Sequence, residues 1–216
     1  MINRSSKAAA FVIAMFGAIA TFIQLSYSLS YKLTDGYSVL YGINHFYSYF
    51  TCLINTLVFT CLFCYSIFPN SRFTRWFMRP ASNGGVLLYI LIVGIIFYIL
   101  LYSTNTARGW DLLATHVVHG LVPVSYFLLW FFYFRSGALK FLHCLEWLMV
   151  PGLYFVYILG RGELLLVYPY FFLNAAKYGY GQVTLNAVGI LCFFLVMGAA
   201  LVYIDKKTPL RIKARN

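Results

Sequence analysis

The stretch GVLLYILIVGIIFYILLYS, residues 85–103, carries no charged side chain. At about 1.5 Å per residue, a helix of this length spans about 30 Å, the thickness of a bilayer core. The apolar run is continuous rather than alternating, which excludes a strand of a membrane β-barrel. The stretch therefore predicts a membrane-spanning α-helix.

Five further runs of similar character occur, at 8–30, 46–68, 112–134, 141–159 and 183–204. Of the 216 residues, 62% are hydrophobic and 10% are charged. Soluble domains usually carry about 25% charged residues, so the composition excludes a water-soluble protein. We predict an all-α integral membrane protein in which a single six-span domain occupies residues 1–216.

The first run follows Arg4 and Lys7, as the core of a signal peptide would. Its apolar part is longer than a typical signal core, and no convincing small-residue cleavage site follows it. We therefore expect this run to be retained as a helix.

The basic residues predict an orientation. With both termini in the cytoplasm, the Lys and Arg residues that fall outside are only four of the 16: Lys32, Arg108, Arg161 and Lys177. The positive-inside rule favours this arrangement, which requires an even number of spans. The same bias explains the net charge of +11 without a nucleic-acid partner. We expect the basic tail, 205–216, to lie against anionic headgroups.

The cysteines do not indicate a disulfide framework, because all five fall within predicted spans: Cys52, Cys61, Cys64, Cys144 and Cys192. Cys61 and Cys64 form a CxxC pattern. Inside a membrane helix, we interpret this pair as packing residues.

Polar groups inside a bilayer are expensive, so their positions are informative. In the orientation above, four of the six spans place such groups in their outer halves: Gln24, Thr51, Asn55, His116, His119 and Asn186. From the helical rise, Thr51 lies roughly 7–8 Å into its span and His119 roughly 10–11 Å. These two residues can meet if the second and fourth spans are neighbours. Glu146 falls in the inner half, away from this layer.

His119 is followed four residues later by Pro123. Proline has no N–H to give to the carbonyl of His119, so a local kink and a cavity are expected there. Asp111, Thr115 and His119 recur at helical spacing, and Asp111 either orients the imidazole or caps the helix. Taken singly, Thr51 and Asn55 also fit a bond to the preceding turn or between helices.

Three blocks of the chain resemble one membrane family: YFTCLINTLVF (49–59), THVVHGLVPV (115–124) and YPYFFLNAAKYGYGQVTLNAVG (168–189). This is the androgen-induced and androgen-dependent TFPI-regulating protein family, which has bacterial six-span relatives. Its animal members hydrolyse fatty acid esters of hydroxy fatty acids with a membrane-embedded threonine and a histidine. The third block is most similar to the bacterial branch, which implies a bacterial cytoplasmic membrane.

The resemblance implies that Thr51 is the nucleophile and His119 the second catalytic residue, with no cofactor or metal. Chemically, a threonine hydroxyl needs a base within hydrogen-bond reach, and neutral imidazole can accept and return its proton. We further infer that Asn55, one turn from Thr51, donates to the developing oxyanion. The substrate would be a lipid ester that enters from the bilayer. Segment 164–174 is expected to lie along the outer surface, either as a lid beside the site or as a plain interfacial anchor.

Three other interpretations remain open. A protein that binds lipid or a partner without catalysis would use the polar layer only to hold its helices together. A haem or metal protein would draw on the four histidines, although His143 lies near the opposite end from His116 and His119. A transporter would usually carry further intramembrane acids or bases beyond Glu146.

Overall fold

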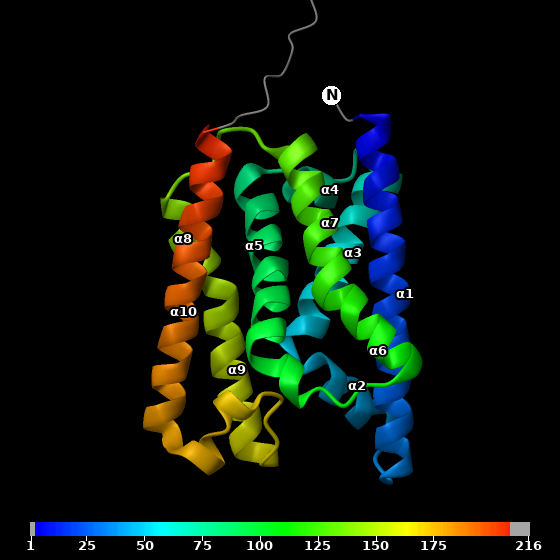
Figure 1. The fold of residues 1–216 in the computed structure, drawn as a ribbon, viewed down its shortest axis with the longest axis vertical. Coiled ribbons are helices and arrows are strands. Elements are labelled where there is room, and N and C mark those ends of the chain that lie inside the picture. Colours follow the sequence, from blue (N-terminus) through cyan, green and yellow to red (C-terminus); the bar gives the residue numbers. More distant parts are fainter. Residues whose placement is uncertain (1–2, 208–216) are drawn as a thin grey trace, which may run out of the picture.

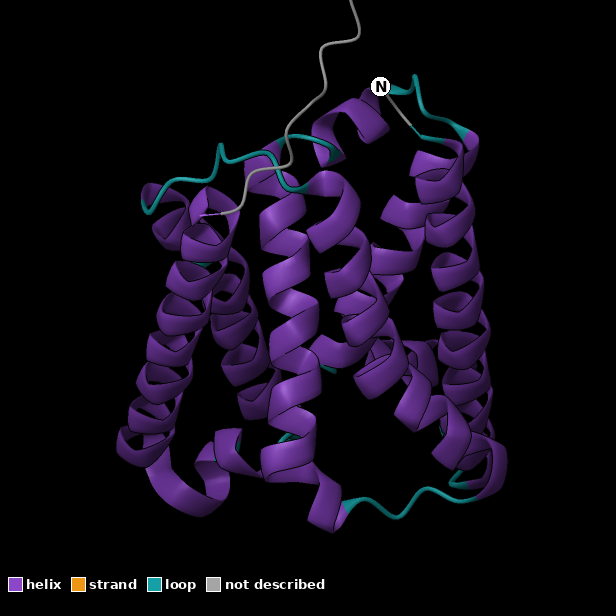
Figure 2. Ribbon diagram, turned by 45° about the horizontal axis from the view of Figure 1, so that its top comes forward, coloured by secondary structure: helices purple, strands orange, loops and turns teal. Residues whose placement is uncertain are grey.

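The computed structural model describes residues 3–207, in which nearly every residue is helical and none lies in a strand (Figure 2). Within this range, six helices are long and apolar enough to cross a membrane. The predicted all-α, six-helix architecture is confirmed. The expected basic tail, 205–216, overlaps the last helix up to Lys207, and residues 208–216 lie outside the described part.

The first two spans are α1 (Arg4–Thr34) and α3 (Phe50–Ile67). The third joins α5 (Pro80–Ile96) to a π-helical turn, η1 (Phe97–Leu101), and a 3-10 turn, η2 (Tyr102–Thr104). The fourth is composed of α6 (Gly109–His116), the π-helical η3 (Val117–Leu121), α7 (Val122–Leu129) and η4 (Trp130–Phe134). The fifth comprises α8 (Leu142–Trp147) and α9 (Met149–Leu165), and the sixth is α10 (Ala175–Lys207). Three short helices lie outside these spans: α2 (Val39–Tyr47), α4 (Arg72–Phe77) and η5 (Phe171–Leu173).

The second span begins at Phe50 rather than at residue 46, where the apolar run starts. Ser48 is the C-cap of α2, and its hydroxyl donates to the carbonyl of His45, at 2.6 Å. The carbonyl of Ser48 in turn accepts the Tyr154 hydroxyl from α9, at 2.7 Å. Tyr49 is then extended and precedes the first turn of α3. Thr51 therefore lies in the first turn of its helix and not deep within the span.

Helix α5 lies in the middle of the bundle, between α10 and α7 in Figure 1. It packs against α3, α7 and α10, and α1 packs against α3 and α6. Of the six spans, it has the largest buried share. A central helix can be apolar on every side, as the composition of 85–103 requires.

The start of α1 and the end of α10 lie at the same end of the bundle (Figure 1). The opposite end, which we name the loop end, holds α2, the connection after η2 and the segment between α9 and α10. Leu166 ends α9 in a left-handed conformation, with φ at 53°. Gly179 kinks α10 near its start, with φ at 74°, so the straight part of the sixth span begins after it.

A glycine allows α5 to approach the fourth span closely. A Cβ atom added at Gly94 would lie 2.6 Å from the carbonyl oxygen of His119 and 3.2 Å from the Pro123 ring. Pro123 leaves this carbonyl without its usual helical donor, and the π-helical turn η3 contains His119. The contact with Gly94 thus fixes the depth at which the His119 backbone lies against α5.

We expect Gly94→Ala to destabilise the protein by about 1–3 kcal/mol, because the added methyl group must push η3 away from α5. The measurement is a thermal melt in detergent. Gly152→Ala is the matched control, since a Cβ atom there would meet nothing within 4 Å. Equal melting temperatures for both variants would contradict the proposed close contact.

Candidate functional site

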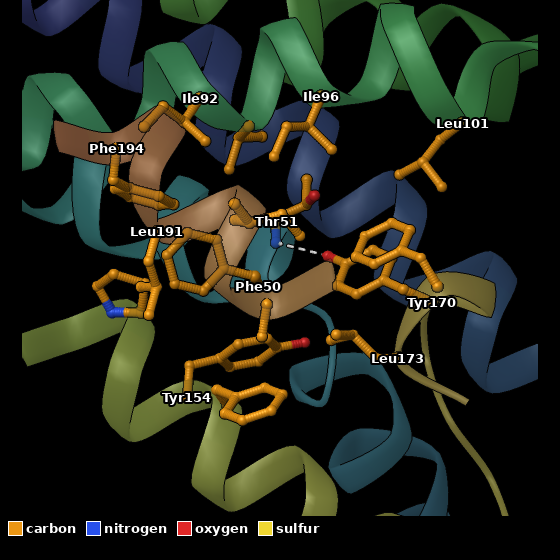
Figure 3. A pocket seen from close by; sticks show the side chains of 16 residues that line it. Phe50, Thr51, Ile92, Ile96, Leu101, Tyr154, Tyr170, Leu173, Leu191 and Phe194 are labelled. Carbon is orange, nitrogen blue, oxygen red and sulfur yellow. Dashed lines mark hydrogen bonds between the residues drawn. The ribbon is translucent and has the colours of Figure 1, made fainter. Parts of the chain in front are cut away.

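Thr51 lies in the first turn of α3, where backbone N–H groups have no acceptor within the helix. The first N–H groups of a helix have no partner within it. The Thr51 N–H donates to the hydroxyl of Tyr170, with 3.4 Å between nitrogen and oxygen (Figure 3). Thr51 thus presents both a hydroxyl and a backbone N–H at the loop end of the bundle.

His119 is held in one tautomer and one orientation. Its Nδ1 atom lies 2.8 Å from the carbonyl oxygen of Thr115. A carbonyl can only accept, so Nδ1 carries the proton and Nε2 keeps a lone pair. The ring stacks on Phe97, with 3.8 Å between centroids and 17° between planes. The result is a fixed imidazole whose Nε2 can accept a proton.

Thr51 and His119 line the same cavity, of about 690 Å³. We name it the polar cavity, because charged and polar side chains such as Lys32 and Asp111 also line it. Its wall is built from one face of α1, from α2, from the start of α3, from η1 and from the fourth span. Helix α3 also contacts η3 directly, so the second and fourth spans are neighbours. Among the described residues, no hydrogen bond joins the Thr51 hydroxyl to His119. A substrate could therefore be placed between them.

Two more of the predicted polar residues, Gln24 and Asp111, line this cavity. The Gln24 amide donates to the Thr115 hydroxyl, at 3.2 Å. Asp111 lies in the first turn of α6, whose N-cap is Arg108, so Asp111 does not cap the helix. The orienting acceptor of His119 is the Thr115 carbonyl and not the Asp111 carboxylate.

The other three predicted residues lie outside the cavity lining. Asn55 is buried, and its Nδ2 donates back to the carbonyl of Thr51, at 3.0 Å. His116 pairs with Tyr98, with 3.0 Å between Nδ1 and Oη. Asn186 donates to the carbonyl of Phe172, at 2.8 Å. Asn55 and Asn186 each bond to a backbone carbonyl, and His116 bonds to a tyrosine. The Asn55 amide nitrogen therefore points to the Thr51 carbonyl and not to the Thr51 hydroxyl.

Tyr170 is the site residue that the sequence did not single out. It comes from the segment expected to form a lid, but its side chain is only 9% exposed. Burial raises the pKa of its phenol, while hydrogen bonds from the side chain and backbone of Thr51 lower it. Its ring also stacks on Phe172 and meets Tyr49 edge-on. The stretch YPYFFL, one of those that carry the resemblance stated above, contains Tyr170, and this resemblance was the available signal.

A second, apolar cavity of about 80 Å³ adjoins Thr51 on its other side (Figure 3). Side chains of α5, α9, α10 and the segment around η5 form its wall. Thr51, Leu101 and Tyr170 line both cavities, so they form the partition between them.

The residues present give no candidate metal centre. In the described range, no group of three or more His, Cys, Asp or Glu side chains converges. Comparison with protein-family models, with curated proteins and with solved structures finds no match to this chain.

His45, on α2, lines the polar cavity near the partition. Burial, followed by the positive charges of Lys32 and Arg161, lowers the pKa of this imidazole to about 4. Its Nδ1 is buried without a hydrogen-bond partner among the described residues. A neutral His45 keeps another cation out of the cavity at neutral pH.

We expect the folded protein to lose stability as the pH falls from about 6.5 towards 4. The unfolded chain binds a proton at His45 near the ordinary histidine pKa of about 6.5, whereas the folded chain does so only near 4. The measurement is the melting temperature as a function of pH for the wild type and for His45→Gln, with His143→Gln as the control. The His45 variant should flatten this part of the curve. A curve unchanged by His45→Gln would contradict the assignment.

Proposed function

We propose that this protein is a membrane-embedded hydrolase of fatty acyl esters, with Thr51 as nucleophile and His119 as general base. Fatty acid esters of hydroxy fatty acids are one substrate class that the family resemblance suggests. The observation that carries the proposal is the shared cavity: a fixed imidazole with a free Nε2 and a threonine at a helix start line the same space.

The reaction begins when the Thr51 hydroxyl attacks the ester carbonyl carbon and gives its proton to Nε2 of His119. The carbonyl oxygen becomes an oxyanion. When the oxyanion collapses, the bond to the alcohol breaks and the alcohol oxygen takes the proton from His119. The acyl group remains on Thr51.

Water from the polar cavity completes the cycle. It attacks the acyl-threonine carbonyl while His119 accepts one of its protons. The second tetrahedral intermediate releases the fatty acid, and the proton on His119 returns to the Thr51 oxygen. In sum, one ester and one water give one acid and one alcohol.

Two donors are in place for the oxyanion. The Thr51 N–H already points at the Tyr170 hydroxyl, and that hydroxyl has its own proton to give. An ester oxygen that lies beside both groups and replaces the bond between them would receive both hydrogen bonds, and the dipole at the N-terminus of α3 would stabilise its negative charge. We therefore assign the oxyanion to Thr51 and Tyr170 in place of Asn55, whose amide donates to a backbone carbonyl.

We also propose that both termini are cytoplasmic and that the site lies in the outer half of a bacterial cytoplasmic membrane. The basic segments at the end of the bundle opposite the loop end support this orientation through the positive-inside rule. The substrate then comes from the outer leaflet, and the basic residues near the C-terminus contact anionic headgroups.

A lipophilic fluorophosphonate, which labels activated hydroxyl nucleophiles, tests the nucleophile and its base. We expect one adduct by intact mass on the wild type and none on Thr51→Ala or His119→Ala. Thr60→Ala is the matched control, because it makes the same change on α3 outside both cavities. Thermal melts verify that each variant is folded.

Equal labelling of Thr51→Ala and the wild type would reject Thr51 as the nucleophile. A wild type that neither labels nor hydrolyses long-chain esters would favour the non-catalytic lipid- or partner-binding alternative.

Tyr170→Phe should lower kcat by about 100-fold, as the loss of one oxyanion donor does in soluble hydrolases. The fold should persist, because the ring and its stacking on Phe172 are kept. Ester hydrolysis measures the effect, and Tyr168→Phe is the control on the same segment. A Tyr170 variant with wild-type kcat would remove this residue from the oxyanion site.

A further inference from the structure

The apolar cavity beside Thr51 has no role in the chemistry described above. It lies between α5, α9 and α10 and is closed at the loop end by Tyr170 and Leu173 (Figure 3). No charged side chain lines it. Deep in the bundle, Ile92, Phe194 and Ala187 bound it, and each is nearly fully buried.

A groove of about 710 Å³ continues from this cavity to the outer surface of the bundle. The groove lies between the end of the third span and α10, and Ile96, Phe172 and Ile190 line both spaces. Its rim includes Ile99, which is 72% exposed. In a membrane, this apolar rim faces the acyl chains of the surrounding lipid.

We propose that the apolar cavity and the groove together bind a single fatty acyl chain, which enters sideways between α5 and α10. The chain passes Ile96, Phe172 and Ile190 and places its carbonyl carbon at Thr51. This inference rests on the proposed function for the identity of the carbonyl as an ester, but the binding of the chain itself does not depend on catalysis.

The occupant follows from size and lining. An apolar cavity of about 150 Å³ holds one benzene ring, so a space of about 80 Å³ suits an extended chain and excludes a ring system or a headgroup. A charged headgroup would also find no partner there. Moving a chain from lipid into the cavity gains little from dehydration, because lipid is already apolar. The gain is close contact with walls that otherwise lack partner atoms.

Two amide side chains that line the groove, Gln182 and Asn186, hold the backbone around η5 in place. Gln182 donates to Asn186, at 2.9 Å, and Asn186 donates to the Phe172 carbonyl. This pair fixes the backbone of η5 at Phe172, whose side chain lines the passage, and Tyr170, which directly precedes η5, contacts Thr51. The predicted layer residue Asn186 therefore positions the wall of the acyl site.

A photoreactive fatty acid with a diazirine in mid-chain tests the site on Thr51→Ala protein, which cannot turn over. We expect crosslinks, mapped by mass spectrometry, at residues that line the cavity: Ile92 and Ile96 of α5, and Ala187, Ile190, Leu191 and Phe194 of α10. Crosslinks confined to the exposed face of α10, such as Val188, or to α1 would overturn the proposal.

A second measurement compares a long-chain with a short-chain fluorophosphonate on otherwise wild-type protein. Ala187→Phe fills the cavity, so the ratio of long-chain to short-chain labelling rates should fall about tenfold or more. Ala200→Phe makes the same change at an exposed position of α10 and should keep the wild-type ratio.

The two measurements separate the two proposals. Crosslinks at the expected positions with no labelling of the wild type would leave the acyl site standing and reject the hydrolase. Labelling of Thr51 with crosslinks elsewhere and an unchanged ratio in Ala187→Phe would keep the hydrolase and reject the acyl site.

Discussion

The bond between Nδ1 of His119 and the carbonyl of Thr115 is the interaction on which the site depends. In an apolar bundle, a histidine without a partner would be costly to bury and free to turn. This bond removes both problems, because it satisfies one nitrogen and fixes which nitrogen is left. Phe97 stacks on one face of the ring, and Gly94 lies against the backbone carbonyl of His119. Together these contacts fix the position of the imidazole.

The position of Thr51 in the first turn of α3 matters as much as its hydroxyl. In mid-helix, its N–H would be bonded to the preceding turn and unable to contact a substrate. The break after α2 frees this N–H, which donates to the hydroxyl of Tyr170, a residue far away in the sequence. In the proposed hydrolase, Thr51 would therefore supply both the nucleophile and one oxyanion donor, and Tyr170 would supply the second donor. The Asn55 amide, bonded to the Thr51 carbonyl, supports the same turn from within the helix.

The sequence predicted the six spans because each is an uninterrupted apolar run, and it brought Thr51 and His119 to one layer. It could not predict where α3 begins, since HFYSYF contains neither Gly nor Pro. At that break, the Ser48 carbonyl accepts the hydroxyl of Tyr154, which lies 106 residues along the chain. His116 was grouped with His119 because they are about one turn apart in an α-helix. The π-helical turn is wider, so three residues there fall short of a turn, and His116 pairs with Tyr98 instead.

An ester hydrolase inside a bilayer needs both an apolar environment and access to water. Its acyl chain belongs in an apolar environment, but the second half of the reaction consumes water, which the surrounding lipid does not hold. In the proposed mechanism, two cavities that share one wall would meet both demands: the apolar one would hold the acyl chain, and the other would admit water to His119. Thr51, Leu101 and Tyr170 form that wall, so a scissile carbonyl at Thr51 would lie at the boundary itself. Tyr170 suits this position because its ring packs on Phe172, while its hydroxyl lies at Thr51, where the proposed reaction would place the oxyanion.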